Sequence, residues 1–288
     1  GLKAPQGWRF CQLDLVEQRI DGEALRSFQP DVVVHAAADT SIMGGWQCDL
    51  VNRKGTELLL RSIEGASSPR FVFVSTAYVH GAGSGELIRE ADGRAAVDAI
   101  HLNAYARSKA DAERLVEASG LPSLILRPSI LVGPNGHAGR NWVRELSQWA
   151  AVLGEAPVDP DAAVDIVPVD FCVDAILSSL GERQDGVDVC NISAGAESLR
   201  CSDLVRLGQA IRSRRDPLRL IPPEQWDEDR FERTASTDER YALARISPLL
   251  PHLNLNVSFC NRRLRDEVGV VPPSRHDIEA AITRAVTN

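Results

Sequence analysis

The chain has 288 residues, of which 44% are hydrophobic and 25% are charged, so it can bury a sizeable core as a globular protein. Its formal net charge of −8 argues against nucleic acid or an anionic membrane surface as the main partner. The six cysteines show no C-x-x-C pair or metal-ligand spacing, and no apolar run approaches the ~18 residues of a membrane helix. We therefore expect a cytoplasmic protein without a metal site.

Strands and helices are predicted to alternate along the first half of the chain. Strands are expected over residues 8–13, 31–38, 70–75 and 123–127, and helices over 21–28, 46–63 and 103–119. The run from Asp31 to Ala38 is rich in valine, which is typical of a strand buried on both faces of a parallel sheet. This order predicts the α/β class, with a doubly wound parallel sheet of the Rossmann type.

The rhythm changes after residue 139. A helix is predicted from an apolar stripe, and a second helix over 171–180, a strand over 187–192 and a terminal helix over 277–286 follow. The stripe consists of Trp142, Leu146, Trp149 and Leu153. We expect one domain over 1–139 and a smaller, mixed region over 140–288, with residues 165–195 returning to the sheet of the first domain.

Tyr105 and Lys109 lie one turn apart on a helix that Asn103 can cap. A free phenol has a pKa of about 10 and is a poor proton donor or acceptor at neutral pH. A nearby ammonium lowers that pKa toward the range in which general acid–base catalysis is efficient. The alternative is a buried tyrosine beside a lysine whose stem packs on the core. The pair alone does not decide between them.

Several short motifs occur in an order that is known from one superfamily. They are Val34–Ala38, Val51–Thr56, Val74–Gly81, the Tyr105/Lys109 pair, Arg127–Ser129 and Val167–Asp170. With them, the chain resembles the extended short-chain dehydrogenase/reductase superfamily. The segments Ser75–Gly81 and Asp165–Asp170 look most similar to the branch of fatty acyl-CoA reductases and thioester reductase domains. The resemblance covers about residues 10–195.

The resemblance implies a catalytic set of Thr76, Tyr105, Lys109 and Asn52. Thr76 would steady the oxygen of a substrate carbonyl, and Tyr105 would protonate it as hydride arrives. Lys109 would hold the cofactor ribose and lower the pKa of Tyr105, and Asn52 would bind water or backbone on the proton path. On chemistry alone, Thr76 could equally end a strand and Asn52 could be satisfied by a neighbour inside its helix.

The implied cofactor is NADPH, with NADH as the alternative, and residues 1–139 would be its dinucleotide-binding core. The cofactor would contact Lys109 and a set of small or turn-forming residues, namely Asp14, Ala36, Ala37, Ala38, Pro128 and Ser129. Asp14 would accept a hydrogen bond from the adenine amino group, although an aspartate in this place could also simply form a turn.

The Gly-rich phosphate loop with which this superfamily opens is not found in the sequence. The cluster Gly81–Gly85 follows a strand but opens no helix, and the cluster Gly133–Gly139 lies in a substrate-side loop late in the fold, so we reject both. About two βα units, roughly 60 residues, would be missing from the centre of the sheet. We expect the sequence to be a fragment or processed form, with a partner chain that completes the sheet as the alternative.

The implied reaction is NAD(P)H-dependent reduction of an acyl thioester, on CoA or a phosphopantetheinyl carrier protein, to an aldehyde or alcohol. Alternatives are a sugar-nucleotide epimerase or dehydratase, a hydroxysteroid-type dehydrogenase, or a non-catalytic protein of the same fold. Residues 140–288 would bind the substrate. The candidate contacts are His80, Arg140, Trp142, Trp149, Arg214 and Arg215. The alternatives are that the tryptophan stripe is plain core and that the arginine cluster is a solvated helix end.

Overall fold

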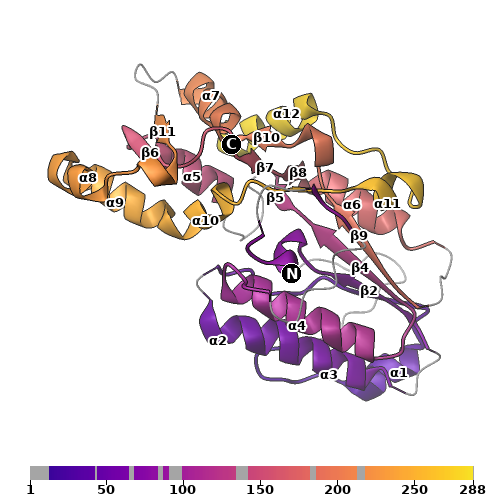
Figure 1. Ribbon diagram of the computed structural model, residues 1–288. Helices are drawn as coiled ribbons and strands as arrows, with labels where there is room; N and C mark the ends of the chain where they lie inside the picture. The colour runs from indigo at the N-terminus through magenta and orange to yellow at the C-terminus, as the bar shows by residue number, and fades with distance from the viewer. Residues whose placement is uncertain are drawn as a thin grey trace. The chain divides into compact units, whose positions relative to one another are not determined.

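The computed structural model describes residues 13–42, 44–64, 68–83, 87–90, 99–133, 142–181, 186–212 and 218–287, without the side chains of Trp142 and Arg212 (Figure 1). The chain forms two compact units. Unit 1 comprises Gly1–Val79, Asn103–Leu126 and Leu180–Val189, and unit 2 comprises His80–Leu102, Arg127–Ser179 and Cys190–Asn288. This division differs from a boundary at residue 139, because the chain passes between the units several times. Unit 2 is the larger one, not the smaller.

The central sheet has four strands in the order β1-β2-β4-β9. They are β1 (Val32–His35), β2 (Arg70–Val74), β4 (Ser123–Pro128) and β9 (Val187–Ile192). β2 pairs in parallel with β1, with Phe71 opposite Val33, and in parallel with β4, with Phe71 opposite Ser123. The predicted α/β class with a parallel, Rossmann-like sheet is confirmed. β9, which comes after residue 165 in the chain, is the fourth strand of this sheet.

β1 differs from its prediction in length and in burial. It ends at His35, and Val34 is 42% exposed. The prediction of a strand buried on both faces is therefore wrong for β1. The reason is its place in the sheet: within the described residues, β1 is an end strand that pairs only with β2. The strand predicted over 8–13 lies almost entirely outside the described residues.

The helices of unit 1 follow the predicted ranges, with one irregularity. They are α1 (Gly22–Phe28), α2 (Gly45–Cys48), α3 (Gly55–Ser62) and α4 (Ala104–Ala118). Between α2 and α3, residues Asp49–Lys54 form a π-helical turn, η1, inside what was predicted as one helix. Such turns in α-helices are frequent at functional sites. The predicted cap of α4 is confirmed, since the Asn103 side chain accepts a hydrogen bond from the Ala106 amide at 2.8 Å.

The core of unit 1 lies between its helices and one face of the sheet. Leu59 and Ile63 of the α3 segment, Val116 of α4, and Phe71 and Phe73 of β2 are buried together. Figure 1 shows α3 and α4 running side by side along this face. Each such side chain contributes about 1.5–3 kcal/mol by leaving water. The packing therefore fixes α4, which carries Tyr105 and Lys109, against β2.

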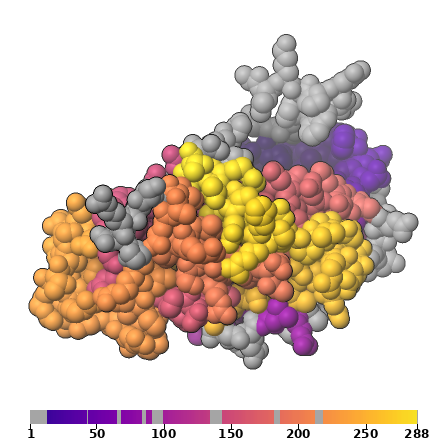
Figure 2. Space-filling model, turned by 90° about the horizontal axis from the view of Figure 1, so that it is seen from above, coloured from indigo at the N-terminus to yellow at the C-terminus, as the bar shows by residue number. Residues whose placement is uncertain are grey.

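Unit 2 combines short strand pairs with helices. The pairs are β5 (Ile130–Val132) with β8 (Ile166–Pro168), β6 (Glu155–Pro157) with β11 (Arg219–Ile221), β7 (Ala163–Val164) with β10 (Leu199–Arg200), and β3 (Leu87–Ile88) with β12 (Ser258–Phe259). The helices are α5 (Trp142–Ala150), α6 (Val169–Ser178), α7 (Cys201–Arg212), α8 (Glu228–Thr234), α9 (Thr237–Ile246), α10 (Leu250–Leu253), α11 (Arg262–Asp266) and α12 (Arg275–Thr287). Figure 2 shows α12, in yellow, lying on the surface beside the orange α7.

A buried carboxylate joins three segments of unit 2. Asp165 has no exposed surface and accepts hydrogen bonds from the amides of Ala194 at 2.8 Å, Gly195 at 3.3 Å and Phe259 at 3.4 Å. Burial raises the pKa of Asp165, while these hydrogen bonds oppose the rise. Asp165 thus ties the strand β8 to the turn after β9 and to β12.

No helix in the described part of the chain combines the length and the hydrophobicity that crossing a membrane requires.

Candidate active site

The predicted catalytic residues Thr76 and Tyr105 meet in unit 1. Thr76 lies two residues after the end of β2 and is buried, and Tyr105 lies in the first turn of α4 and is half-buried. Their side chains are hydrogen-bonded. Burial raises the pKa of Tyr105 to about 12, the hydrogen bond from Thr76 opposes this rise, and the nearby Cys48 adds to it. Tyr105 is therefore protonated at neutral pH and can act as a proton donor.

Lys109 is buried on the same face of α4, as the helical spacing predicted. Its side chain is 1% exposed, and its Nζ lies 4.0 Å from the centre of the Phe73 ring. Burial lowers the pKa of Lys109 to about 7, and the carboxylate of Glu113 opposes this shift. The amine is also close enough to His35 to help lower the pKa of that residue. Lys109 thus faces the β1–β2 side of α4.

This arrangement corrects one expectation about the Tyr105/Lys109 pair. Lys109 was expected to lower the pKa of Tyr105, but that pKa is raised, and the groups that shift it are Thr76 and Cys48 rather than Lys109. The physical reason is that burial outweighs charge here. A desolvated phenolate is costly, and a desolvated amine loses much of its own charge near neutral pH.

Asn52 is buried in the π-helical turn and is fully engaged with protein groups. Its Oδ1 accepts a hydrogen bond from the Asp39 amide at 2.8 Å, and its Nδ2 donates to the Asp39 carbonyl at 2.9 Å. The same Nδ2 donates to Ser108 Oγ at 2.9 Å. Asn52 therefore fixes the loop that follows β1 and joins it to α4. Two roles were expected for Asn52: binding water or backbone on the proton path, or being satisfied by a neighbour. Its bonds to the Asp39 backbone and to Ser108 agree with both.

Sequence reasoning missed the residues that support this arrangement. Ser108 Oγ donates to the Tyr105 carbonyl at 2.8 Å, so it connects Asn52 to the first turn of α4. The backbone carbonyl of Asn52 accepts a hydrogen bond from Thr56 Oγ1 at 2.5 Å. Thr56 Oγ1 in turn lies 2.9 Å from His35 Nε2. Burial lowers the pKa of His35 to about 3, so its ring is neutral. The only sequence signal for Ser108 is its position three residues after Tyr105.

The predicted cofactor contacts lie in both units. In unit 1, Ala36, Ala37 and Ala38 follow β1 directly, and Ala36 and Ala37 are exposed. Asp14 Oδ1 accepts from the amides of Val16 at 3.0 Å and Glu17 at 2.9 Å, which is the turn that was named as the alternative to adenine binding. In unit 2, Pro128 ends β4, and Ser129 follows it and is buried.

Two of the predicted substrate contacts are described, and both pack within unit 2. The His80 ring lies edge-on to Phe259 at 5.3 Å, and the half-buried Trp149 ring lies edge-on to Tyr241 at 5.4 Å. Trp149 and the fully buried Leu153 belong to the core of unit 2, which was the alternative for the stripe. Four predicted contacts fall outside the description, namely Arg140, Arg214, Arg215 and the side chain of Trp142.

The residues at the end of β2 fit a ligand that carries hydrogen-bond acceptors. Next to the hydrogen-bonded hydroxyls of Thr76 and Tyr105, the buried Ser75 Oγ makes no hydrogen bond within the described part of the chain. A buried hydroxyl without a partner costs free energy, so such groups are usually satisfied by a ligand or by water. Ser75 Oγ could therefore donate to an acceptor of a bound ligand.

Comparison with a family model places residues 20–176 in the NAD-binding family described as male sterility protein. Among curated proteins, the chain is 31% identical over 138 residues to human dTDP-D-glucose 4,6-dehydratase, covering 45% of this chain and 38% of that protein. It is 31% identical over 153 residues to dTDP-4-dehydrorhamnose reductase of Aggregatibacter actinomycetemcomitans, covering 50% and 49%. The chain thus spans about half or less of the length of these relatives.

Solved structures confirm the fold at low sequence identity. The structure of UDP-glucuronic acid 4-epimerase from Bacillus cereus in complex with UDP-glucuronic acid and NAD is similar, with a TM-score of 0.68 and 18% identity. That alignment covers 95% of this chain and 80% of the epimerase. The structure of RMD from Pseudomonas aeruginosa complexed with NADPH has a TM-score of 0.63 and 20% identity, over 99% and 90%.

Proposed function

Because this chain belongs to the NAD-binding family described as male sterility protein, we propose that the complete protein is a nicotinamide-dependent enzyme that oxidises and reduces a sugar nucleotide. The names of its relatives support a sugar nucleotide over the acyl thioester expected from the sequence. They include a dTDP-D-glucose 4,6-dehydratase, a dTDP-4-dehydrorhamnose reductase and a UDP-glucuronic acid 4-epimerase. The reaction class is accordingly that of epimerases, dehydratases and related reductases.

The hydrogen-bonded pair of Thr76 and Tyr105 carries this proposal. A hydroxyl carbon can be oxidised only if its O–H proton leaves as hydride leaves the carbon, and the reverse reaction needs a proton donor at the same oxygen. Tyr105 supplies the proton, since its raised pKa keeps it protonated in this structure. With a substrate bound, Thr76 would donate its one hydroxyl proton to the same substrate oxygen instead of to Tyr105, and stabilise charge that develops there.

A bound nicotinamide dinucleotide would supply or accept the hydride. In unit 1, the residues proposed to hold it are Ser75, the alanines of Ala36–Ala38 and Lys109. Ser75 contributes a buried hydroxyl that has no partner among the described residues, and the alanines leave room for a backbone approach after β1. Lys109 contributes an amine with a pKa of about 7, so that a nearby phosphate or carboxylate would favour its charged form. Asn52 and Ser108 keep the first turn of α4 in place.

An acyl thioester on CoA or a carrier protein remains a second candidate substrate, with NADPH as its reductant. The matching family model is the observation that favours it. The relatives' names point the other way. The same pair of Thr76 and Tyr105 would serve either substrate, because both reactions need a proton at an oxygen next to the hydride acceptor.

The test is a substrate panel with the complete gene product that contains this chain. UDP-glucose, UDP-glucuronic acid and dTDP-glucose would be incubated with NAD, and acyl-CoA substrates with NADPH and NADH, with products followed by NMR. We expect conversion of a sugar nucleotide and no consumption of reduced cofactor with acyl-CoA. Conversion of acyl-CoA alone would replace the proposal by the second candidate. No turnover of any substrate, together with no binding of either cofactor, would favour the non-catalytic alternative.

A further inference from the structure

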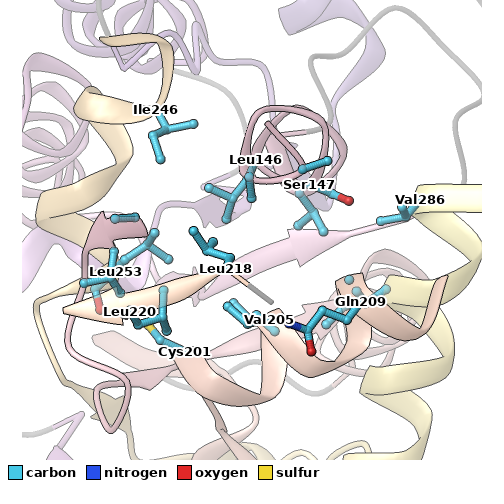
Figure 3. Close-up of a pocket in the computed structure, with 18 of the residues that line it drawn as sticks. Leu146, Ser147, Cys201, Val205, Gln209, Leu218, Leu220, Ile246, Leu253 and Val286 are labelled. Atoms are coloured by element: carbon cyan, nitrogen blue, oxygen red, sulfur yellow. Dashed lines mark hydrogen bonds between the residues drawn. The ribbon is translucent and has the colours of Figure 1, made fainter. Parts of the chain in front are cut away.

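Unit 2 contains a cavity of about 100 Å³ between α5, α7, β11 and α12. Figure 3 shows side chains from α5, such as Leu146, and from α7, such as Val205, converging on it from opposite sides, with Leu218 and Leu220 between them. All lining residues belong to unit 2. The cavity is partly open to the surface, and apolar side chains that remain open to water call for an explanation.

The lining is almost entirely aliphatic. None of the described residues that line the cavity carries a charge, and its polar side chains are those of Ser147, Cys201 and Gln209. Cys201 Sγ is engaged with the Leu253 carbonyl at 3.4 Å. A nucleotide, a sugar or the phosphates of CoA would therefore find no counter-charge here. The cavity fits an uncharged, apolar molecule.

Gly208 keeps the cavity open from the α7 side. It lies inside the helix, where glycine is the least favourable residue except proline. A Cβ built on Gly208 would meet no atom within 4 Å, so a larger side chain would fit without strain. A glycine at this position weakens the helix and leaves space that a methyl group could fill, so it does not stabilise the free protein. Its effect is to leave room in the cavity for a ligand.

Gln209 gives the cavity one polar feature. Its Nε2 is buried and makes no hydrogen bond within the described part of the chain. Figure 3 shows the Gln209 amide at the edge of the cavity, on the same helix as Val205. A buried amide N–H without an acceptor is costly, and a ligand oxygen placed beside it would remove that cost.

We propose that this cavity, lined by Leu146, Val205, Gly208, Gln209, Leu220 and Ile282, is a binding site for a small, uncharged, apolar molecule with one hydrogen-bond acceptor. The acceptor lies against Gln209 Nε2, and the hydrocarbon part lies between α5 and α7. The volume of about 100 Å³ is about two thirds of the volume of a cavity that holds benzene, so it suits a molecule of about four or five heavy atoms. This site goes beyond the proposed function, because the Thr76–Tyr105 pair belongs to unit 1 and none of its residues lines the cavity.

The test compares two probes of equal size, butanone with a carbonyl acceptor and 2-methylbut-1-ene without one. Methyl NMR titrations would follow Ile246 and Ile282, which line the cavity. We expect saturable binding of both probes by the wild type. Gln209→Met removes the amide donor at nearly constant volume. It should weaken the binding of butanone about five-fold, the value of one net hydrogen bond, and leave the binding of the alkene unchanged. Gln148→Met, at an exposed position of α5, is the matched control and should change neither.

Gly208→Leu is the second variant. It should fill the cavity and abolish binding of both probes, while the melting temperature stays equal or rises, because leucine is a better helix former than glycine. If this variant does not fold, Gly208→Ala takes its place and should weaken both probes. Failure of the wild type to bind either probe near its solubility limit would overturn the proposal. So would unchanged binding to a folded Gly208→Leu variant.

Discussion

The amine of Lys109 lies 4.0 Å from the centre of the Phe73 ring, buried between α4 and β2. A cation over an aromatic face is favourable, but it does not replace the hydration that the amine gives up. This explains why the pKa of Lys109 is lowered to about 7 even though Glu113 opposes the shift. At neutral pH the residue therefore sits near the midpoint of its titration, where a bound anion could shift it to the charged form.

The first prediction concerns the pH dependence of stability. Lys109 has a pKa of about 7 in the folded chain and about 10.5 when unfolded, so the unfolded state binds more protons between these values. The cost of burying the amine is complete below pH 7 and is relieved as the pH rises toward 10.5. The free energy of unfolding would be measured for the wild type and for Lys109→Met by urea titration. From pH 7 to pH 9.5, the wild type should gain roughly 2–3 kcal/mol of stability relative to the variant. A constant difference would contradict the lowered pKa.

The second prediction concerns the proton donor. Tyr105→Phe removes the hydroxyl that is bonded to Thr76 and keeps the ring, so turnover in the complete protein should fall by about 10²–10⁴-fold. The melting temperature should change little, since only one hydrogen bond is lost. Tyr241→Phe, at a tyrosine that is 58% exposed in unit 2, is the matched control and should keep wild-type turnover. Equal rates for wild type and Tyr105→Phe would rule out Tyr105 as the acid.

The third prediction concerns Asn52. Asn52→Ala leaves the Asp39 amide and carbonyl without their side-chain partner, and Ser108 without its donor. The free energy of unfolding should fall by about 2–4 kcal/mol, because buried polar groups that lose a partner each cost about 1–3 kcal/mol. Asn52→Asp keeps an acceptor for the Asp39 amide but turns a buried carboxylate oxygen toward the Asp39 carbonyl, so it should lose at least as much in the same urea titration. A loss below 0.5 kcal/mol for Asn52→Ala would show that the loop after β1 does not depend on this side chain.

The fourth prediction concerns the buried carboxylate of unit 2. Asp165→Ala leaves the amides of Ala194, Gly195 and Phe259 without their acceptor, so thermal unfolding should show a destabilisation of about 3–5 kcal/mol. The control is Asp161→Ala, which removes a carboxylate that is 79% exposed and paired with Arg200, and should cost less than about 1 kcal/mol. Similar losses in both variants would mean that Asp165 does not join the three segments.

Much of unit 1 could be predicted from the sequence because its signals are local. The valine run of β1, the apolar strand β2 and the helical spacing of Tyr105, Lys109 and Val116 each reflect the period of one element. Motif order then indicated the superfamily, and the family model agrees with it in residues 20–176. The acyl thioester that the motifs favoured and the sugar nucleotide that the relatives' names favour stay alternatives, since substrate choice depends on groups spread along the chain.

The sequence by itself determined the parallel α/β sheet, the capped helix of Tyr105 and the burial of Lys109, because spacing along one helix or strand decides which side chains face inward. Only the tertiary structure decided that Asn52 would hold Asp39 and Ser108, that Lys109 would face Phe73, and that burial would raise the pKa of Tyr105. These features depend on contacts between residues that are far apart in the chain, and on the water that those contacts exclude. Hydrophobic periodicity carries no information about either.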